Sequence, residues 1–220
     1  MIPIHRLLNG PLLFTIAIVV AGCSTAVEDS VNEPVAVAEI QLLKENGLGQ
    51  WKPAQFAHFG EIMVRDSVLY LDLGSYLTGV VWKGELPARS NFEIELEARK
   101  TFGSDFLLGL TVPVGESHCT WICGGWGGRI VGISDINGKS ADRNETTSEM
   151  KFEQNQWYRF RMRVEERRIR CWIDNEAVID VDISGKQISM RPGEIDTAIP
   201  LSITSFDTMA EYRNIVWRSL

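Results

Sequence analysis

The chain has 220 residues, a formal net charge of −7 and 45% hydrophobic residues. This length suffices for one large domain and falls short of two comfortable ones. No cluster of Lys and Arg offsets the acidic charge, so we expect no nucleic-acid partner. Beyond the first 22 residues no segment approaches 18 consecutive apolar residues, so no membrane-spanning helix is expected there.

The N-terminal segment has the layout of a secretory signal. A short apolar run follows His5 and Arg6 and ends in Ala21-Gly22-Cys23, and it is too short to be a comfortable transmembrane helix. It resembles the lipobox of bacterial lipoproteins, in which the cysteine is acylated and the peptide is cut before it. The resemblance implies a signal peptide over residues 1–22 and lipidation at Cys23. The alternatives are an ordinary cleaved signal or an uncleaved anchor helix.

Residues 23–38 are predicted to be a flexible tether to a domain over residues 39–220. They are small, polar and acidic and include Pro34, a composition that buries little surface. Ser24 follows the cysteine, and enteric lipoproteins kept at the inner membrane favour Asp there. We therefore expect a lipid-anchored protein of the bacterial cell envelope, held at the outer membrane and facing the periplasm or the cell surface.

The rest of the chain predicts β-strands almost throughout. Glu39–Glu45 is the one helix-like pattern, and it is short. Phe92–Arg99, Phe160–Val164 and Ile169–Ile173 alternate apolar and polar residues with period two, and a polar break before Val178–Ile183 predicts a hairpin. The other predicted strands are Val68–Leu73, Gly79–Lys83, Phe106–Val112, Arg129–Ser134, Leu201–Phe206 and Tyr212–Arg218.

Many strands without intervening helices predict an all-β, two-sheet antiparallel jelly-roll sandwich. Trp82 shares a face with Val80 and is expected in the core, whereas Trp172 is expected to be an exposed aromatic or an inter-sheet residue. The alternation predicts that one face of each strand is buried, which places nine side chains in the core: Phe92, Ile94, Leu96, Phe160, Met162, Val164, Ile169, Cys171 and Ile173.

Three cysteines follow the signal: Cys119, Cys123 and Cys171. In an oxidising compartment an odd number allows at most one internal disulfide and leaves one thiol. A Cys119–Cys123 bond would need a turn between them, because a spacing of four in a straight strand separates the sulfurs by about 13 Å. The sequence leaves the pairing open and favours Cys171 as an inert core residue.

Four segments resemble the 3-keto-disaccharide hydrolase domain family, formerly a domain of unknown function, which has a concanavalin-like jelly-roll fold. They are Asn91–Arg99, Gln156–Val164, Ile169–Glu176 and Glu211–Trp217. The first three are shared by many concanavalin-like and laminin-G-like domains, and the Arg-Asn-Ile of the last favours this family. The resemblance covers roughly residues 48–220 and implies an envelope protein that acts on carbohydrate.

The sequence departs from the fullest family pattern where the sugar site is expected. That pattern has N-S-G-x-x-x-R and then G-x-E-x-Q, whereas Leu107–Pro113 and Gly124–Arg129 contain no Glu or Gln at the matching places. No catalytic residue is therefore carried over from the family. The alternative to a glycoside hydrolase is a non-catalytic module that binds a glycan or another envelope partner.

The densest candidate site spans residues 116–147. Glycines on both sides of Trp126 let the backbone approach closely and leave an indole face suited to the C–H face of a sugar ring. The alternatives are a tight bend around a core Trp and, for residues 142–145, a solvated loop. The predicted ligand-binding set is Trp126, Trp121, Arg129, Arg143, Asn144 and Glu145.

Hydrolysis of a glycoside requires a base and an acid that flank the bond. A 3-keto sugar would need less, because its ketone acidifies the C2 proton and one base could then expel the C1 substituent. Asp135 is a further carboxylate close in sequence to the Trp-rich segment. A lone histidine such as His118 is more often structural than catalytic. His118 with Cys119 and Cys123 fits no zinc pattern, so neither metal nor cofactor is expected. The candidate catalytic residues are His118, Asp105, Glu116 and Glu145.

Overall fold

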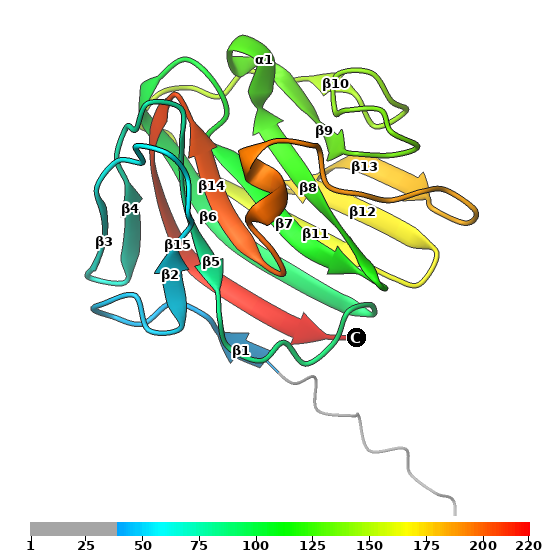
Figure 1. The fold of residues 1–220 in the computed structure, drawn as a ribbon, viewed down its shortest axis with the longest axis horizontal. Helices are drawn as coiled ribbons and strands as arrows, with labels where there is room; N and C mark the ends of the chain where they lie inside the picture. The colour runs from blue at the N-terminus through cyan, green and yellow to red at the C-terminus, as the bar shows by residue number, and fades with distance from the viewer. Residues whose placement is uncertain (1–38) are drawn as a thin grey trace, which may run out of the picture. The chain divides into compact units, whose positions relative to one another are not determined.

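A computed structural model describes residues 39–220, so the expected signal, Cys23 and the tether lie outside the described residues. Over 39–220 the chain forms two antiparallel sheets packed face to face (Figure 1). This confirms the predicted all-β jelly-roll sandwich. Within the described part, no helix is long and apolar enough to cross a membrane.

The sandwich consists of sheet A with eight strands and sheet B with seven. Sheet A has the order β13 (Glu176–Asp182), β12 (Arg168–Ile173), β11 (Tyr158–Val164), β6 (Phe92–Gly103), β15 (Thr208–Ser219), β4 (Val68–Leu71) and β3 (Ile62–Arg65), with β1 (Glu39–Gln41) paired to β15. Sheet B has the order β10 (Ser148–Glu149), β9 (Ile130–Ser134), β8 (Ser117–Gly124), β7 (Leu108–Val114), β14 (Ser202–Phe206), β5 (Leu77–Trp82) and β2 (Trp51–Pro53). A four-residue turn labelled α1 (Gly125–Gly128), whose middle residues have left-handed dihedral angles, and a 3-10 helix, η1 (Glu194–Thr197), complete the set.

The core lies between the two sheets and contains the inward face of each alternating strand. All nine predicted core side chains are at most 2% exposed, and Trp82 is also buried. Trp121 from sheet B meets Phe160 from sheet A edge-on with ring centroids 5.8 Å apart. Phe92 and Trp217 stack within sheet A at 3.9 Å. The period-two alternation therefore predicted the buried face correctly.

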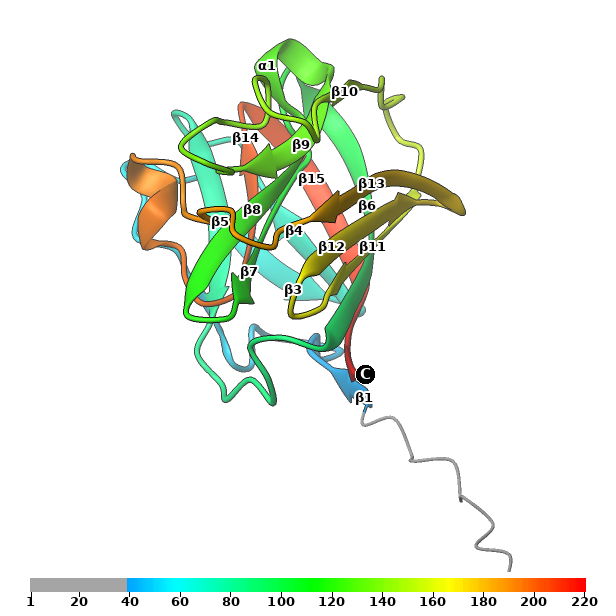
Figure 2. The same cartoon turned by 90° about the vertical axis from the view of Figure 1, so that its right-hand side faces the viewer.

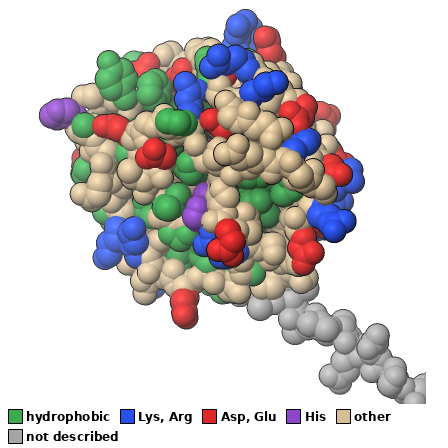
Figure 3. Space-filling view, turned by 45° about the vertical axis from the view of Figure 1, so that its right-hand side comes forward, with side chains coloured by type: hydrophobic (Ala, Val, Ile, Leu, Met, Phe, Trp, Pro, Cys, Tyr) green, Lys and Arg blue, Asp and Glu red, His purple; other side chains and the backbone are tan. Residues whose placement is uncertain are grey.

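The outer face of sheet A carries the charged partners of these core residues. Glu93 is itself buried and binds Arg163 at 2.8 Å. Trp172 lies on this face, half-buried, with the Arg161 guanidinium 4.1 Å from its ring centroid. Charged groups of both signs are also mixed across the surface seen in Figure 3. Trp172 is thus neither an inter-sheet residue nor a free aromatic, because Arg161 stacks on it.

Two local expectations are corrected or decided by the strand structure. The expectation of a helix at Glu39–Glu45 was wrong, because Glu39–Gln41 forms a strand that pairs with β15. β8 runs without a turn through Cys119 and Cys123, so these two cannot bond to each other. Both, together with Cys171, are free and buried, and burial raises the pKa of all three thiols. They are inert core residues.

Candidate functional site

Residues 184–200, within the connection between β13 and β14, cross the outer face of sheet B (Figures 1 and 2). We call this segment the strap. Backbone hydrogen bonds hold it to the end of β9: Asp135 N donates to Ser189 O at 2.7 Å, and Asn137 N donates to Gln187 O at 2.8 Å. The strap next places Arg191 at the pocket and then turns through η1, which begins at the pocket residue Glu194.

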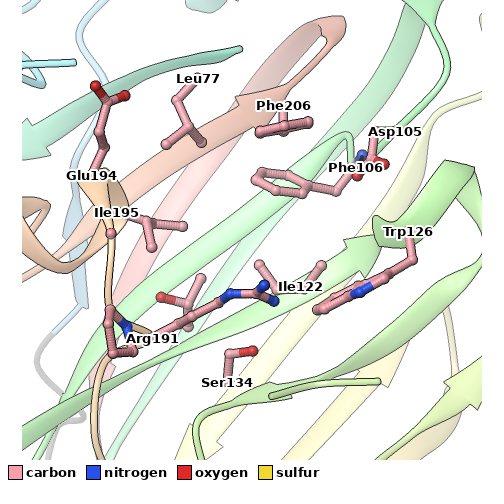
Figure 4. Close-up of a pocket in the computed structure, with 13 residues that line it drawn as sticks. Leu77, Asp105, Phe106, Ile122, Trp126, Ser134, Arg191, Glu194, Ile195 and Phe206 are labelled. Carbon is pink, nitrogen blue, oxygen red and sulfur yellow. Dashed lines mark hydrogen bonds between the residues drawn. The ribbon is translucent and has the colours of Figure 1, made fainter. Parts of the chain in front are cut away.

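A pocket of about 340 Å³ lies between the strap, sheet B and the turn α1. Its volume is at the low end for small-molecule sites. Figure 4 shows the side chains that converge on it from these elements. Its lining comprises Leu77, Asp105, Phe106, Thr120, Ile122, Trp126, Ser134, Arg191, Pro192, Gly193, Glu194, Ile195 and Phe206.

Trp126 stands at the mouth of this pocket in an unusual backbone conformation. Its φ of 51° lies in the left-handed region, and its side chain is 37% exposed despite its size. A non-glycine residue in that region costs about 1–3 kcal/mol and persists where the surroundings enforce it. The flanking Gly127 also has positive φ. The turn thus presents the indole instead of burying it.

Asp105 fastens the turn that carries Trp126. Its Oδ2 accepts a hydrogen bond from Gly127 N at 2.7 Å, and its Oδ1 accepts one from Phe106 N at 2.9 Å. Both carboxylate oxygens therefore already bind backbone N–H groups. Asp105 lines the pocket, which a catalytic residue must do. Its hydrogen bonds, however, suit it to hold the Trp126 turn in place.

Arg191 reaches from the strap toward Trp126 across the pocket (Figure 4). Its guanidinium carbon lies 5.1 Å from the centroid of the indole ring, within cation–π range. Among residues 39–220 it forms no ion pair, because no carboxylate oxygen lies within 4.0 Å of it. Its N–H donors therefore remain available to a ligand in the pocket.

The floor of the pocket is part of a row of hydroxyl groups that crosses four strands. Ser202, Thr111, Thr120 and Ser134 are successive cross-strand partners on β14, β7, β8 and β9. The Oγ1 atoms of Thr111 and Thr120 lie 2.8 Å apart, and Thr120 and Ser134 reach the pocket. The cavity therefore has a polar floor beneath an aromatic wall.

Asp135 follows Ser134 and is a buried carboxyl group, 5% exposed. Its Oδ1 has no hydrogen-bond partner among the described residues. Burial raises the pKa of Asp135, and the Ser134 hydroxyl and the Arg191 guanidinium only partly offset this. Asp135 does not itself line the pocket, but it adjoins Ser134, which does, and its carboxyl group is desolvated.

Five of the six predicted ligand-binding residues lie elsewhere: the four described here and Glu145, which was also a catalytic candidate. Trp121 is fully buried between the sheets, so the expectation that it contacts ligand is corrected: it is a core residue. Arg129 and Arg143 are exposed and lie near Glu149 and Asp142. Asn144 Nδ2 donates to Ile133 O, Lys139 O and Ser140 O, and its Oδ1 accepts from Thr146, so it folds the loop around itself. None of the four lines the Trp126 pocket.

Three predicted catalytic candidates are also away from the pocket. Glu145 forms an ion pair with Lys186 at 2.6 Å, which lowers the pKa of Glu145. Glu116 is exposed in the turn before β8. His118 is half-buried beside Arg89, with Nη2 and Nε2 3.3 Å apart, and burial together with Arg89 lowers the pKa of His118. The structure brings only Trp126 and Asp105 of the predicted set together.

The sequence-based search did not find the strap residues Arg191 and Glu194 or the pocket aromatics Phe106 and Phe206. The strap has no strand or helix periodicity, so nothing in its pattern places it on sheet B. Pro192-Gly193 marks a turn and was the one available signal. Over residues 39–220, no group of three or more His, Cys, Asp or Glu side chains is arranged to hold a metal ion.

Comparisons with known proteins agree with this architecture. A candidate glycosyl hydrolase from Parabacteroides distasonis has a similar fold, with 11% sequence identity, coverage of 83% of this chain and 94% of that chain, and a TM-score of 0.54. The transglycosylase Crh5 is also similar, with 9% identity, coverage of 83% of each chain and a TM-score of 0.53. A structure described as a glycosidic hydrolase is also similar (9%, 83% and 94%, 0.51). At these identities the likeness concerns the fold.

None of the curated proteins compared with the sequence matches it. A family model described as a 3-keto-alpha-glucoside-1,2-lyase-like domain matches residues 45–218, nearly all of the sandwich. That match confirms the resemblance seen in the four strand segments. The chain therefore belongs to the 3-keto-disaccharide hydrolase domain family.

Proposed function

We propose that the domain binds a carbohydrate in the Trp126 pocket. The observation that carries this proposal is the pairing of a strained, partly exposed Trp126 with an Arg191 that forms no ion pair within residues 39–220. An indole offers an apolar surface to the C–H groups of a sugar ring, and a guanidinium donates to its hydroxyl oxygens. The hydroxyl groups of Thr120 and Ser134 add polar contacts.

Calorimetric titration with methyl glucosides and their 3-keto forms tests this proposal. Trp126→Ala is expected to weaken binding by about 1–3 kcal/mol, by analogy with aromatic stacking on other planar ligands. The melting temperature should change little, because the indole is not in the core. Arg191→Ala should weaken binding in the same direction, because hydrogen bonds from a charged donor are lost.

Trp172→Ala is the matched control, because Trp172 is a half-buried indole stacked with an arginine on the opposite sheet. It should leave affinity unchanged. Unchanged affinity in a stably folded Trp126→Ala protein would contradict the proposal.

A second candidate function is the elimination that the family description names. Here a base removes the C2 proton of a 3-keto glycoside, the C1–O bond breaks with its electron pair on the departing oxygen, and a C1=C2 double bond forms. Asp135 supports this function because it adjoins the pocket residue Ser134, its Oδ1 has no hydrogen-bond partner among residues 39–220, and burial raises its pKa, as is common for general bases. Asp135→Asn should abolish turnover while binding persists, and Asp142→Asn, on the neighbouring loop, should preserve both.

We further propose that the protein is anchored by lipid at Cys23 in the bacterial outer membrane. The apolar run, the Ala21-Gly22-Cys23 sequence and the acidic segment that follows support this. Cys23→Ala should block acylation and normal processing, and the protein should leave the membrane fraction. Membrane recovery of the variant at the wild-type level would contradict lipid anchoring.

A further inference from the structure

The pocket is divided into a polar part and an apolar part. Figure 4 shows Arg191, Ser134 and Trp126 on one side, and Phe106, Phe206 and Leu77 on the other. Both parts belong to the same cavity. A ligand that fills it therefore needs polar groups at one end and an apolar group at the other.

The apolar part continues out of the pocket as an aromatic shelf, formed by Phe106, Phe206 and Tyr76. Phe106 and Phe206 lie with ring centroids 5.7 Å apart at 33°, and Tyr76 stacks on Phe206 at 5.7 Å and 28°. Phe106 is buried, Phe206 is half-buried and Tyr76 is 65% exposed. The shelf thus runs from the pocket wall to open surface.

The position of the shelf is fixed by the backbone around it. Asp207 N donates to Tyr76 O at 2.9 Å, and Phe206 N donates to Phe106 O at 3.1 Å. These bonds join the three segments that carry the rings. The backbone positions of the three residues are therefore set before any ligand arrives, which lowers the ordering cost of binding.

The chemistry of the shelf selects among ligands that carry a sugar. A second sugar ring stacked on Phe206 would need donors and acceptors for its hydroxyl groups. The side chains between Asp105 and Glu194 on this side, which are Phe106, Phe206, Leu77 and Ile195, have none, and Tyr76 adds only a single hydroxyl group at the exposed end of the shelf. The nearby Asp207 carboxylate accepts a hydrogen bond from Ser104 Oγ at 2.7 Å. An aromatic ring requires no such partners and gains from offset stacking.

We infer that the pocket takes a glycoside whose group at C1 is an aromatic ring, with that ring on the Phe106–Phe206–Tyr76 shelf and the sugar beside Trp126 and Arg191. This inference rests on the proposed carbohydrate binding and names its ligand class. It divides the roles of the aromatic residues. Trp126 serves every glycoside, and Tyr76 serves only those with an aryl group.

Titration with phenyl glucoside, methyl glucoside, cellobiose and maltose, each also in 3-keto form, tests the inference. Phenyl glucoside is expected to bind about tenfold more tightly than methyl glucoside. Tyr76→Ala should weaken phenyl glucoside binding by about 3- to 10-fold, in line with the loss of one aromatic pair, and should leave methyl glucoside unchanged. Because Tyr76 is 65% exposed, this variant should remain folded.

Phe102→Ala is the matched control, because Phe102 is an exposed aromatic, 58%, that does not line the pocket. It should affect neither ligand. Two results would overturn the aryl assignment even if binding still depends on Trp126. One is equal affinity for phenyl and methyl glucosides, and the other is a disaccharide that binds more tightly than phenyl glucoside and loses affinity in Tyr76→Ala. Failure of every glycoside to bind, or binding insensitive to Trp126→Ala, would instead overturn the proposed function.

Discussion

Phe160→Ala is expected to lower the free energy of unfolding by about 3–5 kcal/mol, as truncations of core aromatics do. Phe160 is fully buried on β11 and lies between the sheets. Its ring meets Trp121 edge-on at 5.8 Å and Phe152 at 5.9 Å, so that truncation leaves a cavity among rigid neighbours. Urea unfolding followed by tryptophan fluorescence measures the change.

Arg161→Ala is the control for this prediction, one position along the same strand. Its side chain lies on the outer face, 30% exposed, and contacts Glu93 and Trp172. Glu93 keeps its closer partner Arg163 in the variant. The expected change is below about 1 kcal/mol, as for other partly exposed ion pairs. Equal losses in the two variants would mean that the strand register is wrong.

Gly103→Ala is expected to be similarly destabilising, by roughly 3–5 kcal/mol. Gly103 ends β6 with φ +106°, and an added Cβ would lie 2.3 Å from Asp207 O and 2.5 Å from Thr208 Cα. Both obstacles are backbone atoms of the paired strand region, so they cannot rotate away. Because Asp105 and the Trp126 turn lie just beyond, ligand binding should also fall.

Gly138→Ala is the control that distinguishes the cost of steric overlap in Gly103→Ala from the cost of a positive φ alone. Gly138 also has positive φ, +68°, but an added Cβ would find no atom within 4 Å. It should therefore cost only about 1–2 kcal/mol, the penalty for placing an L-residue in the left-handed region. Thermal and urea unfolding of the two variants give the comparison, and a Gly103→Ala protein as stable as the Gly138→Ala protein would contradict the described β6–β15 junction.

The fold was predictable because alternation is a local property. Phe92, Ile94 and Leu96 occupy every second position, so they predict the buried face of the strand without any information from distant residues. Glu39–Glu45 failed because short segments have weak periodicity. There, pairing with β15 decided the outcome, and the backbone partners Ile40 and Trp217 are remote in sequence.

The site was predictable only where neighbouring residues in the sequence indicate an unusual backbone turn. Glycines around Trp126 drew attention to the turn that presents the indole, and the structure places it in the pocket. Asn144 was misjudged as a ligand contact because its hydrogen bonds within the loop depend on how residues 133–146 fold around it. Arg191 was missed because only the pairing of the strap with Asp135 and Asn137 brings it opposite Trp126.

The central claim is that carbohydrate binds between Trp126 and Arg191. A crystal structure of the protein with a bound methyl glucoside or its 3-keto form tests it most directly. The account predicts that the sugar lies in the pocket on sheet B, in contact with the Trp126 indole and hydrogen-bonded to the Arg191 guanidinium. A sugar bound instead at the second cavity, lined by Glu145, Asp180 and Lys186, with the Trp126 pocket empty, would contradict it.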